Sequence, residues 1–272
     1  MLGLAVVPAV GAEYHRAPAV QAREFRHGPW IGGDLPLPER FRGGRPGAGT
    51  TVRSLRSPAV VGALLLDFDQ TLVDSHGATD WCAALRELAA RFGPLPIPAV
   101  AGCALQTVGV LAAERDPARW AAMSELVEGY ELAGAAGSTL MPHVPALLAG
   151  TLHLPKAIVT SGSAASARAV LARLGVSVEA VVGRSPGLAM KPAPGQVQEA
   201  LRLLGVSPGQ AVMAGDSVWD EAAARAAGVR FIGLANGRPR PEFDPATTVV
   251  EDLRGLLDLL THGDCSPGPM GG

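Results

Sequence analysis

Asp67 and Asp69 stand two residues apart in the segment DFDQT, directly after a run of apolar residues. Carboxylates in this arrangement can act as a nucleophile, as a general acid or base, or as ligands of a divalent cation. They can also simply cap the turn after a buried strand, and this segment by itself does not separate the interpretations. Three later segments carry related chemistry: TSG at residues 160–162, Lys191 in KPAPG, and GDSVWD at residues 215–220.

Lysine is the most informative residue type in this set. The chain contains only two lysines, Lys156 and Lys191, and arginine supplies the rest of its strongly basic side chains. Lys191 is therefore unlike an ordinary solvent-exposed basic residue. We therefore place Lys191 in one set with the acidic segments.

The elements that must position these residues alternate between strand and helix from about residue 58. Residues 60–66 form a continuous apolar run, as in a fully buried parallel strand. Further short apolar runs predict strands, and the segments between them, such as 163–174 and 220–227, predict helices closed by glycine. The predicted strands lie at 157–159, 180–182, 211–214, 231–234 and 248–250. The alternation predicts an α/β fold with a doubly wound parallel sheet, which binds ligands beyond the carboxyl ends of its strands.

One long interval after the first strand breaks the alternation. Trp81, Cys82, Leu85 and Leu88 recur at helical spacing, and two more helices are predicted at about 99–114 and 117–134. We interpret residues 78–136 as an all-helical insert. The core then comprises residues 58–77 and 137–260.

The first part of the chain differs in composition. Residues 1–60 contain eight arginines against four acidic residues, with nine glycines and seven prolines. We therefore predict that residues 1–57 form a disordered extension and that residues 261–272 form a flexible tail. The opening MLGLAVVPAVGA lacks the basic start of a signal peptide, so we do not expect export.

Overall composition excludes several classes of protein. With 48% apolar residues and a net charge of -2, the chain is neither mainly disordered nor generally attracted to nucleic acid. No apolar run is long enough to cross a membrane. Cys82, Cys103 and Cys265 show no CxxC spacing. We expect them to be free thiols in a reducing, cytoplasmic compartment.

In their order along the chain, DFDQT, TSGS, KP and GDSVWD resemble the four motifs of the haloacid dehalogenase (HAD) superfamily. The resemblance covers about residues 58–260. It implies a Rossmann-like core with the strand of Asp67 at its centre and a helical cap inserted after the first motif. Gln70 and His143 depart from the family pattern, where glycine is usual. Neither position carries the reaction, so they bear on loop shape more than on activity.

The resemblance also implies a role for each motif residue. Asp67 would attack phosphorus and form an aspartyl-phosphate, while Asp69 would protonate the leaving oxygen and then activate water. Thr160 would bind the phosphate together with the amides of Ser161 and Gly162 at a helix start, and Lys191 would balance its charge. Magnesium would be held by Asp67, the Asp69 carbonyl, Asp216 and, through water, Asp220.

The second carboxylate favours a phosphatase, because the dehalogenating relatives lack it. We expect a magnesium-dependent phosphatase, monomeric or homodimeric, acting on a small sugar, polyol or glycolate phosphate, without nucleic-acid or membrane partners. His76, on the linker into the cap, is the best candidate for a substrate contact, ahead of Trp81, Arg115 and Arg119. Two alternatives stay open: a phosphomutase of the β-phosphoglucomutase type, which would share these core residues, and a non-catalytic binding protein, which would be expected to have lost one of them.

Overall fold

The computed structural model describes residues 61–75, 77–95, 102–237 and 243–262. The predicted extension at residues 1–57 therefore lies outside the described residues, as do His76, Cys265 and the tail beyond residue 262. Of the predicted tail, residues 261 and 262 are described, and they end the last helix.

Six parallel strands form one sheet in the order β5-β4-β1-β6-β7-β8. The strands are β1 (Ala63–Leu66), β4 (Lys156–Ser163), β5 (Ala180–Arg184), β6 (Ala211–Gly215), β7 (Arg230–Leu234) and β8 (Thr248–Val250). Leu65 of β1 lies opposite Ala157 of β4 on one side and Met213 of β6 on the other. The chain builds outward from β1 first through β4 and then through β6, so the carboxyl end of β1 is a topological switch point, where open α/β sheets bind ligands.

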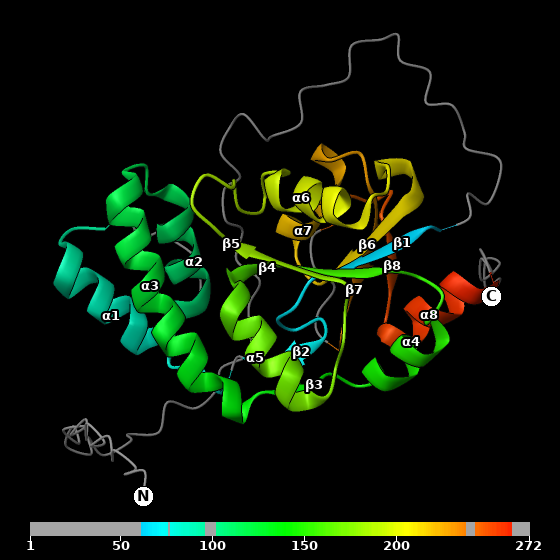
Figure 1. Ribbon diagram of the computed structural model, residues 1–272, viewed down its shortest axis with the longest axis horizontal. Helices are drawn as coiled ribbons and strands as arrows, with labels where there is room; N and C mark the ends of the chain where they lie inside the picture. Colours follow the sequence, from blue (N-terminus) through cyan, green and yellow to red (C-terminus); the bar gives the residue numbers. More distant parts are fainter. Residues whose placement is uncertain (1–60, 76, 96–101, 238–242, 263–272) are drawn as a thin grey trace, which may run out of the picture. The chain divides into compact units, whose positions relative to one another are not determined.

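Helices cover both faces of the sheet (Figure 1). One face carries α4 (Val144–Gly150), α5 (Ala164–Leu174) and α8 (Leu253–His262), and the other carries α6 (Gly195–Leu204) and α7 (Val218–Ala226). Leu64 and Leu66 pack into the first layer and Leu65 into the second, and all three are fully buried. This burial on both faces explains the continuous apolar run, and the predicted doubly wound α/β fold is confirmed.

Three helices lie between the short strands β2 (Val73–Asp74) and β3 (Thr139–Leu140), which pair with each other antiparallel. They are α1 (Trp81–Phe92), α2 (Cys103–Ala113) and α3 (Pro117–Gly134), grouped together in Figure 1 and followed by a 3-10 turn at Ala135–Gly137. Another 3-10 turn, Pro208–Gln210, precedes β6. The three helices share a core of their own, which Met190, the residue before Lys191, also joins. We call these helices the cap; its predicted boundaries, residues 78–136, stay a prediction.

Cys82 and Cys103 form a disulfide that joins α1 to the first residue of α2. The expectation of free thiols is therefore wrong for these two residues. They are 21 positions apart, and only the packing of α1 against α2 brings their Cα atoms to 5.0 Å. This disulfide removes the reason to expect a reducing compartment, and the cytoplasmic location stays a prediction. Within the described ranges, no helix combines the length and apolar character that a membrane span needs.

Gly183 of β5 packs directly against the chain at the end of β4. A Cβ at this position would lie 2.3 Å from the Ala164 nitrogen and 2.8 Å from the Gly162 carbonyl oxygen. Both are backbone atoms, so we expect Gly183→Ala to lower the free energy of unfolding by about 2–3 kcal/mol. Urea denaturation measures this loss.

The matched control is Gly209→Ala, because a Cβ there would meet nothing within 4 Å. This control should change the free energy of unfolding by no more than about 0.5 kcal/mol. Equal stability of the two variants would contradict the close approach of the two segments.

Candidate active site

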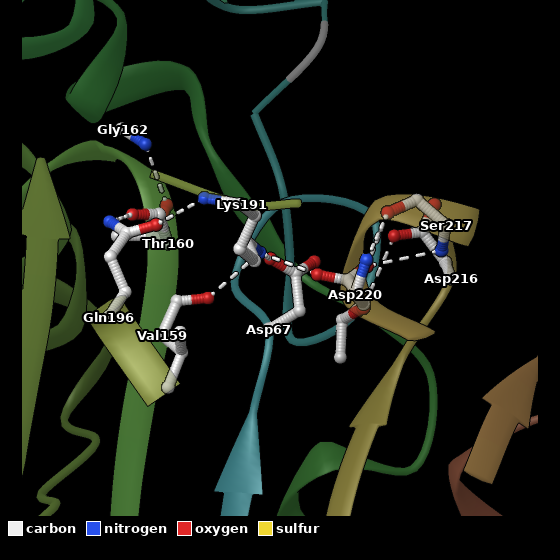
Figure 2. Close-up of polar contacts among 10 residues, drawn as sticks. Asp67, Val159, Thr160, Gly162, Lys191, Gln196, Asp216, Ser217 and Asp220 are labelled. Carbon is white, nitrogen blue, oxygen red and sulfur yellow. Dashed lines mark hydrogen bonds and ion pairs between the residues drawn. The ribbon is translucent and has the colours of Figure 1, made fainter. Parts of the chain in front are cut away.

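The carboxyl ends of β1, β4 and β6 bring the predicted residues together (Figure 2). Asp67 directly follows β1, Thr160 lies near the end of β4, and Asp216 directly follows β6. Lys191 comes from the loop between β5 and α6. Residues that are far apart in the sequence therefore share one edge of the sheet.

Lys191 connects three parts of this site. Its Nζ donates to Asp67 Oδ1 at 2.5 Å, to Asp220 Oδ1 at 2.6 Å and to the Val159 carbonyl oxygen at 3.0 Å. An ammonium group has three donors, so all of them have an acceptor here. Burial of Lys191 by itself lowers its pKa, but the charges of Asp220 and Asp67 outweigh this effect and raise the pKa overall. Lys191 is therefore a buried cation.

Asp67, Asp216 and Asp220 form an acidic cluster whose ligand oxygens all lie within 4.8 Å of one another. Burial raises the pKa of Asp67 well above its ordinary value, and the charges of Asp220 and Asp216 raise it further, against the opposing charge of Lys191. Three carboxylates with a single lysine carry excess negative charge. Their oxygens are the donors that hard divalent cations prefer, so the residues present fit Mg²⁺.

Asp220 is held from two sides. Oδ1 accepts from Lys191, while Oδ2 accepts from the Ser217 amide at 3.1 Å and the Ser217 hydroxyl at 2.5 Å. Ser217 caps α7, and this capping explains why the helix starts at Val218 rather than at Asp220 as predicted. Both oxygens of Asp220 thus have protein donors, and its predicted contact with metal-bound water stays a prediction.

The turn after β1 fixes Asp69. Its Oδ1 accepts from the Ser75 amide at 3.2 Å and from the Ser75 hydroxyl at 2.6 Å. Gln70 adopts φ 59°, the left-handed conformation that glycine favours, and Asn236 Nδ2 donates to its carbonyl oxygen at 2.6 Å. His143, the other departure from the family pattern, also adopts a left-handed φ of 66°. Both residues therefore adopt the backbone conformation that glycine favours, although neither is a glycine.

Thr160, Ser161 and Gly162 lie in an extended chain directly before the start of α5. The strand β4 continues to Ser163, and α5 begins only at Ala164. Gly162 directly precedes Ser163, the residue that caps α5, so this segment leads into a helix start; its role in binding phosphate stays a prediction. Val159 and Ser163 of β4 pair with β5, and the register of the two strands shifts between these two residues.

The Gly162 amide donates to Thr160 Oγ1 at 3.0 Å, and this bond shapes the end of the strand (Figure 2). Gln196, which sequence reasoning missed, is fully buried and connects two motifs. Its Nε2 donates to the Thr160 carbonyl oxygen at 2.6 Å, and its Oε1 accepts from the Lys191 amide at 3.0 Å. A glutamine in the first turn of a helix such as α6 carries no sequence signal that distinguishes it from a surface residue.

A family model described as haloacid dehalogenase-like hydrolase matches residues 61–228, which contain every motif of this site. The chain belongs to this family. A phosphoglycolate phosphatase of Rhodospirillum rubrum is 31% identical over 220 residues, covering 73% of this chain and 90% of the relative. A plasmid-encoded phosphoglycolate phosphatase of Cupriavidus necator is 32% identical over 222 residues, covering 75% and 95%.

Solved structures of HAD proteins share the fold. A putative phosphoglycolate phosphatase from Lactobacillus plantarum has a TM-score of 0.56 at 22% identity, covering 74% of this chain and 99% of the other. CbbY from Rhodobacter sphaeroides, solved with phosphate, has a TM-score of 0.56 at 19% identity, covering 72% and 96%. The predicted family and enzyme class are thus confirmed: the chain is a HAD hydrolase of the phosphatase type.

The cap residues singled out in the sequence have other partners in this HAD hydrolase. Arg119 forms an ion pair with Glu114 at 2.7 Å, and exposed Arg115 donates to the Ala112 carbonyl oxygen at 2.8 Å, both near the start of α3. Trp81 packs against the core of the cap. His76 lies outside the described residues, so its predicted contact with substrate stays a prediction.

Replacing Asp69 tests its role as acid and base. We expect Asp69→Asn to lower kcat for an alkyl phosphate by about 10²–10⁴-fold, the usual contribution of a positioned proton donor. The decrease in the rate of aspartyl-phosphate formation in this variant should be much smaller for a nitrophenyl phosphate, because its leaving group needs no proton. Rapid-quench kinetics on both substrates measures the difference.

The control is Asp258→Asn, a surface carboxylate of α8 that pairs with Arg254. It should keep wild-type kcat on both substrates. If Asp69→Asn loses the same factor in intermediate formation with both leaving groups, Asp69 does not protonate the leaving oxygen.

Proposed function

We propose that this HAD hydrolase uses Mg²⁺ to release phosphate from a small phosphorylated metabolite through an aspartyl-phosphate on Asp67. One observation carries the proposal: Lys191 bridges Asp67 and Asp220 while Asp216 lies within 4.8 Å in the same cluster. A nucleophilic carboxylate, a fixed cation and a set of oxygen ligands thus occur together at a switch point of the sheet. Attack of a carboxylate on a phosphate brings two anions together, and Lys191 together with a bound Mg²⁺ would supply the compensating charge.

The chemistry divides into two steps. In the first, an Asp67 oxygen bonds to phosphorus, the bond from phosphorus to the ester oxygen breaks, and Asp69 gives its proton to that oxygen. In the second, the Asp69 carboxylate takes a proton from water, and the water oxygen displaces Asp67 as inorganic phosphate leaves. Asp69 thereby returns to its protonated form, which closes the cycle.

The remaining residues hold the reacting groups. Lys191 would neutralise charge on Asp67 and on the phosphate, and Asp220 would keep Lys191 in place. Thr160, Ser161 and Gly162 would bind the phosphate oxygens. Asp67, Asp216 and the Asp69 carbonyl would hold Mg²⁺, which when bound would supply positive charge beside the attacked phosphate.

The substrate class is proposed from the relatives. The Rhodospirillum rubrum and Cupriavidus necator proteins, similar over most of their length, are both named for phosphoglycolate. We therefore propose 2-phosphoglycolate as the first compound to test, followed by sugar and polyol phosphates. No observation favours the phosphomutase alternative.

The test is turnover by the purified full-length protein with Mg²⁺. Each compound is incubated separately, inorganic phosphate is measured, and the organic products are identified by nuclear magnetic resonance. Stoichiometric phosphate together with the dephosphorylated compound supports the proposal. Isomerised sugar phosphate without free phosphate, or no turnover of any compound, would overturn it.

A further inference from the structure

A buried ion pair joins the cap to the core. Arg184, the last residue of β5, donates from Nη1 to Glu131 Oε1 at 2.7 Å and from Nη2 to Oε2 at 2.9 Å. Arg184 also donates to the hydroxyl and the carbonyl oxygen of Ser124, one of the other residues of α3. The side chains of Arg184 and Glu131 are 1% and 6% exposed. A bidentate ion pair with additional hydrogen bonds thus connects helix α3 of the cap to β5, the edge strand of the sheet.

The same carboxylate contacts the proposed phosphate-binding segment. Glu131 Oε2 accepts from the Ser163 amide at 3.1 Å. A Cβ placed on Gly162 would lie 3.2 Å from Glu131 Oε1 and 3.3 Å from Thr160 Oγ1. Glu131 therefore lies against the segment from Thr160 to Ser163, although it belongs to the cap.

A carboxylate in this position has two opposing effects on an anionic ligand. Its hydrogen bond to Ser163 holds the binding segment in place, but its negative charge repels phosphate across a buried, weakly screened region. Arg184 is the cation in direct contact with Glu131, and it leaves the pair neutral. The role of Arg184 would then be electrostatic as well as structural.

We propose that Glu131 and Arg184 are positioning residues for phosphate: Glu131 fixes the segment Thr160–Ser163 from the cap, and Arg184 cancels the charge that this contact introduces. The inference rests on the proposed function, because it takes that segment to be the phosphate site. It predicts that the two halves of the pair influence phosphate affinity in opposite directions.

The experiment measures the affinity for inorganic phosphate, both as a competitive inhibitor of nitrophenyl phosphate hydrolysis and by direct titration. Arg184→Gln leaves the Glu131 charge uncompensated, and we expect phosphate binding to weaken on the order of tenfold. Glu131→Gln leaves a positive charge, and we expect binding to tighten or at least not to weaken. The double variant E131Q/R184Q, again neutral and able to hydrogen bond, should return to within about threefold of wild type.

Loss of stability cannot produce this pattern. Either single substitution leaves a buried charge unpaired, so both should lower the thermal unfolding temperature. All variants are assayed below their unfolding transitions. Arg184→Lys keeps the charge without the bidentate geometry, so it should keep phosphate affinity closer to wild type than Arg184→Gln does.

The outcomes separate this inference from the proposed function. Thr160→Val and Lys191→Met are expected to weaken phosphate binding strongly whatever the role of the ion pair. If they do so while R184Q and E131Q shift the affinity in the same direction, or not at all, the pair has only a structural role and the inference is wrong. If the wild-type protein binds no phosphate, the proposed function itself fails.

Discussion

Asp67→Asn should abolish phosphate release, with a loss in kcat of at least about 10⁴-fold, as expected when the nucleophile of a covalent mechanism is removed. The amide has the same shape as the carboxylate but cannot attack phosphorus. Steady-state release from nitrophenyl phosphate measures the loss, and acid-quenched samples should contain phosphorylated wild-type protein but no phosphorylated variant. Asp258→Asn, which changes an exposed side chain of α8, is the control and should retain full activity.

The same substitution should not lower the stability of the metal-free protein, although it abolishes activity. The pKa of Asp67 is raised by burial and by Asp220 and Asp216, so the metal-free fold disfavours the charged carboxylate. Protonated Asp67 favours folding at low pH, and this contribution is lost as the pH rises through the raised pKa. At neutral pH, metal-free D67N should therefore be at least as stable as metal-free wild type, and the difference should vanish at acidic pH. Full phosphate release by D67N would contradict the assignment of Asp67 as the nucleophile. A metal-free D67N much less stable than metal-free wild type would contradict the raised pKa of Asp67.

Removal of divalent metal should have the second large effect. Without a cation, the acidic cluster repels the phosphate of the substrate and Asp67 is disfavoured as a charged nucleophile. We expect a chelator to lower kcat by about 10³-fold or more, and excess Mg²⁺ to restore it. The measurement is phosphate release after extensive dialysis, with and without added metal.

Asp216→Asn serves as the matched variant for the metal experiment. Asp216 contributes to the cluster, while Asp67 and Asp220 form ion pairs with Lys191. Its loss should raise the Mg²⁺ concentration needed for half-maximal activity while leaving Lys191 in place. Activity that survives chelation in the wild-type protein would exclude the metal role.

The catalytic core could be predicted from the sequence because its residues are tied to strand ends. Asp67, Thr160 and Asp216 follow apolar runs that alternate with helical segments and so predict buried strands, and the resemblance of the motifs to the HAD family then implies that their side chains meet. Lys191 was recognisable because lysine is rare in this chain. Each of these signals is local in the sequence, and the parallel sheet brings the residues together because its strands end at the same edge.

Contacts that depend on packing between distant elements were not predictable. Glu131 and Arg184 are 53 residues apart, and neither stands in a motif. Cys82 and Cys103 pair only because two cap helices pack together. Gln196 looks like a surface residue until α6 lies against β4. In each case a single sequence carries no record of which side chains the tertiary fold brings into contact.

The hydrogen bonds of Lys191 have a consequence for how a phosphate can enter. Every proton of the ammonium already has an acceptor, so an arriving phosphate oxygen can only exchange with one of them. The Val159 carbonyl is the most distant of the three, at 3.0 Å, and the one without charge. It is therefore the acceptor given up at the lowest cost. Binding would then turn the ammonium from the strand towards the substrate, and the new hydrogen bond would add to affinity only by its difference from the one that is given up.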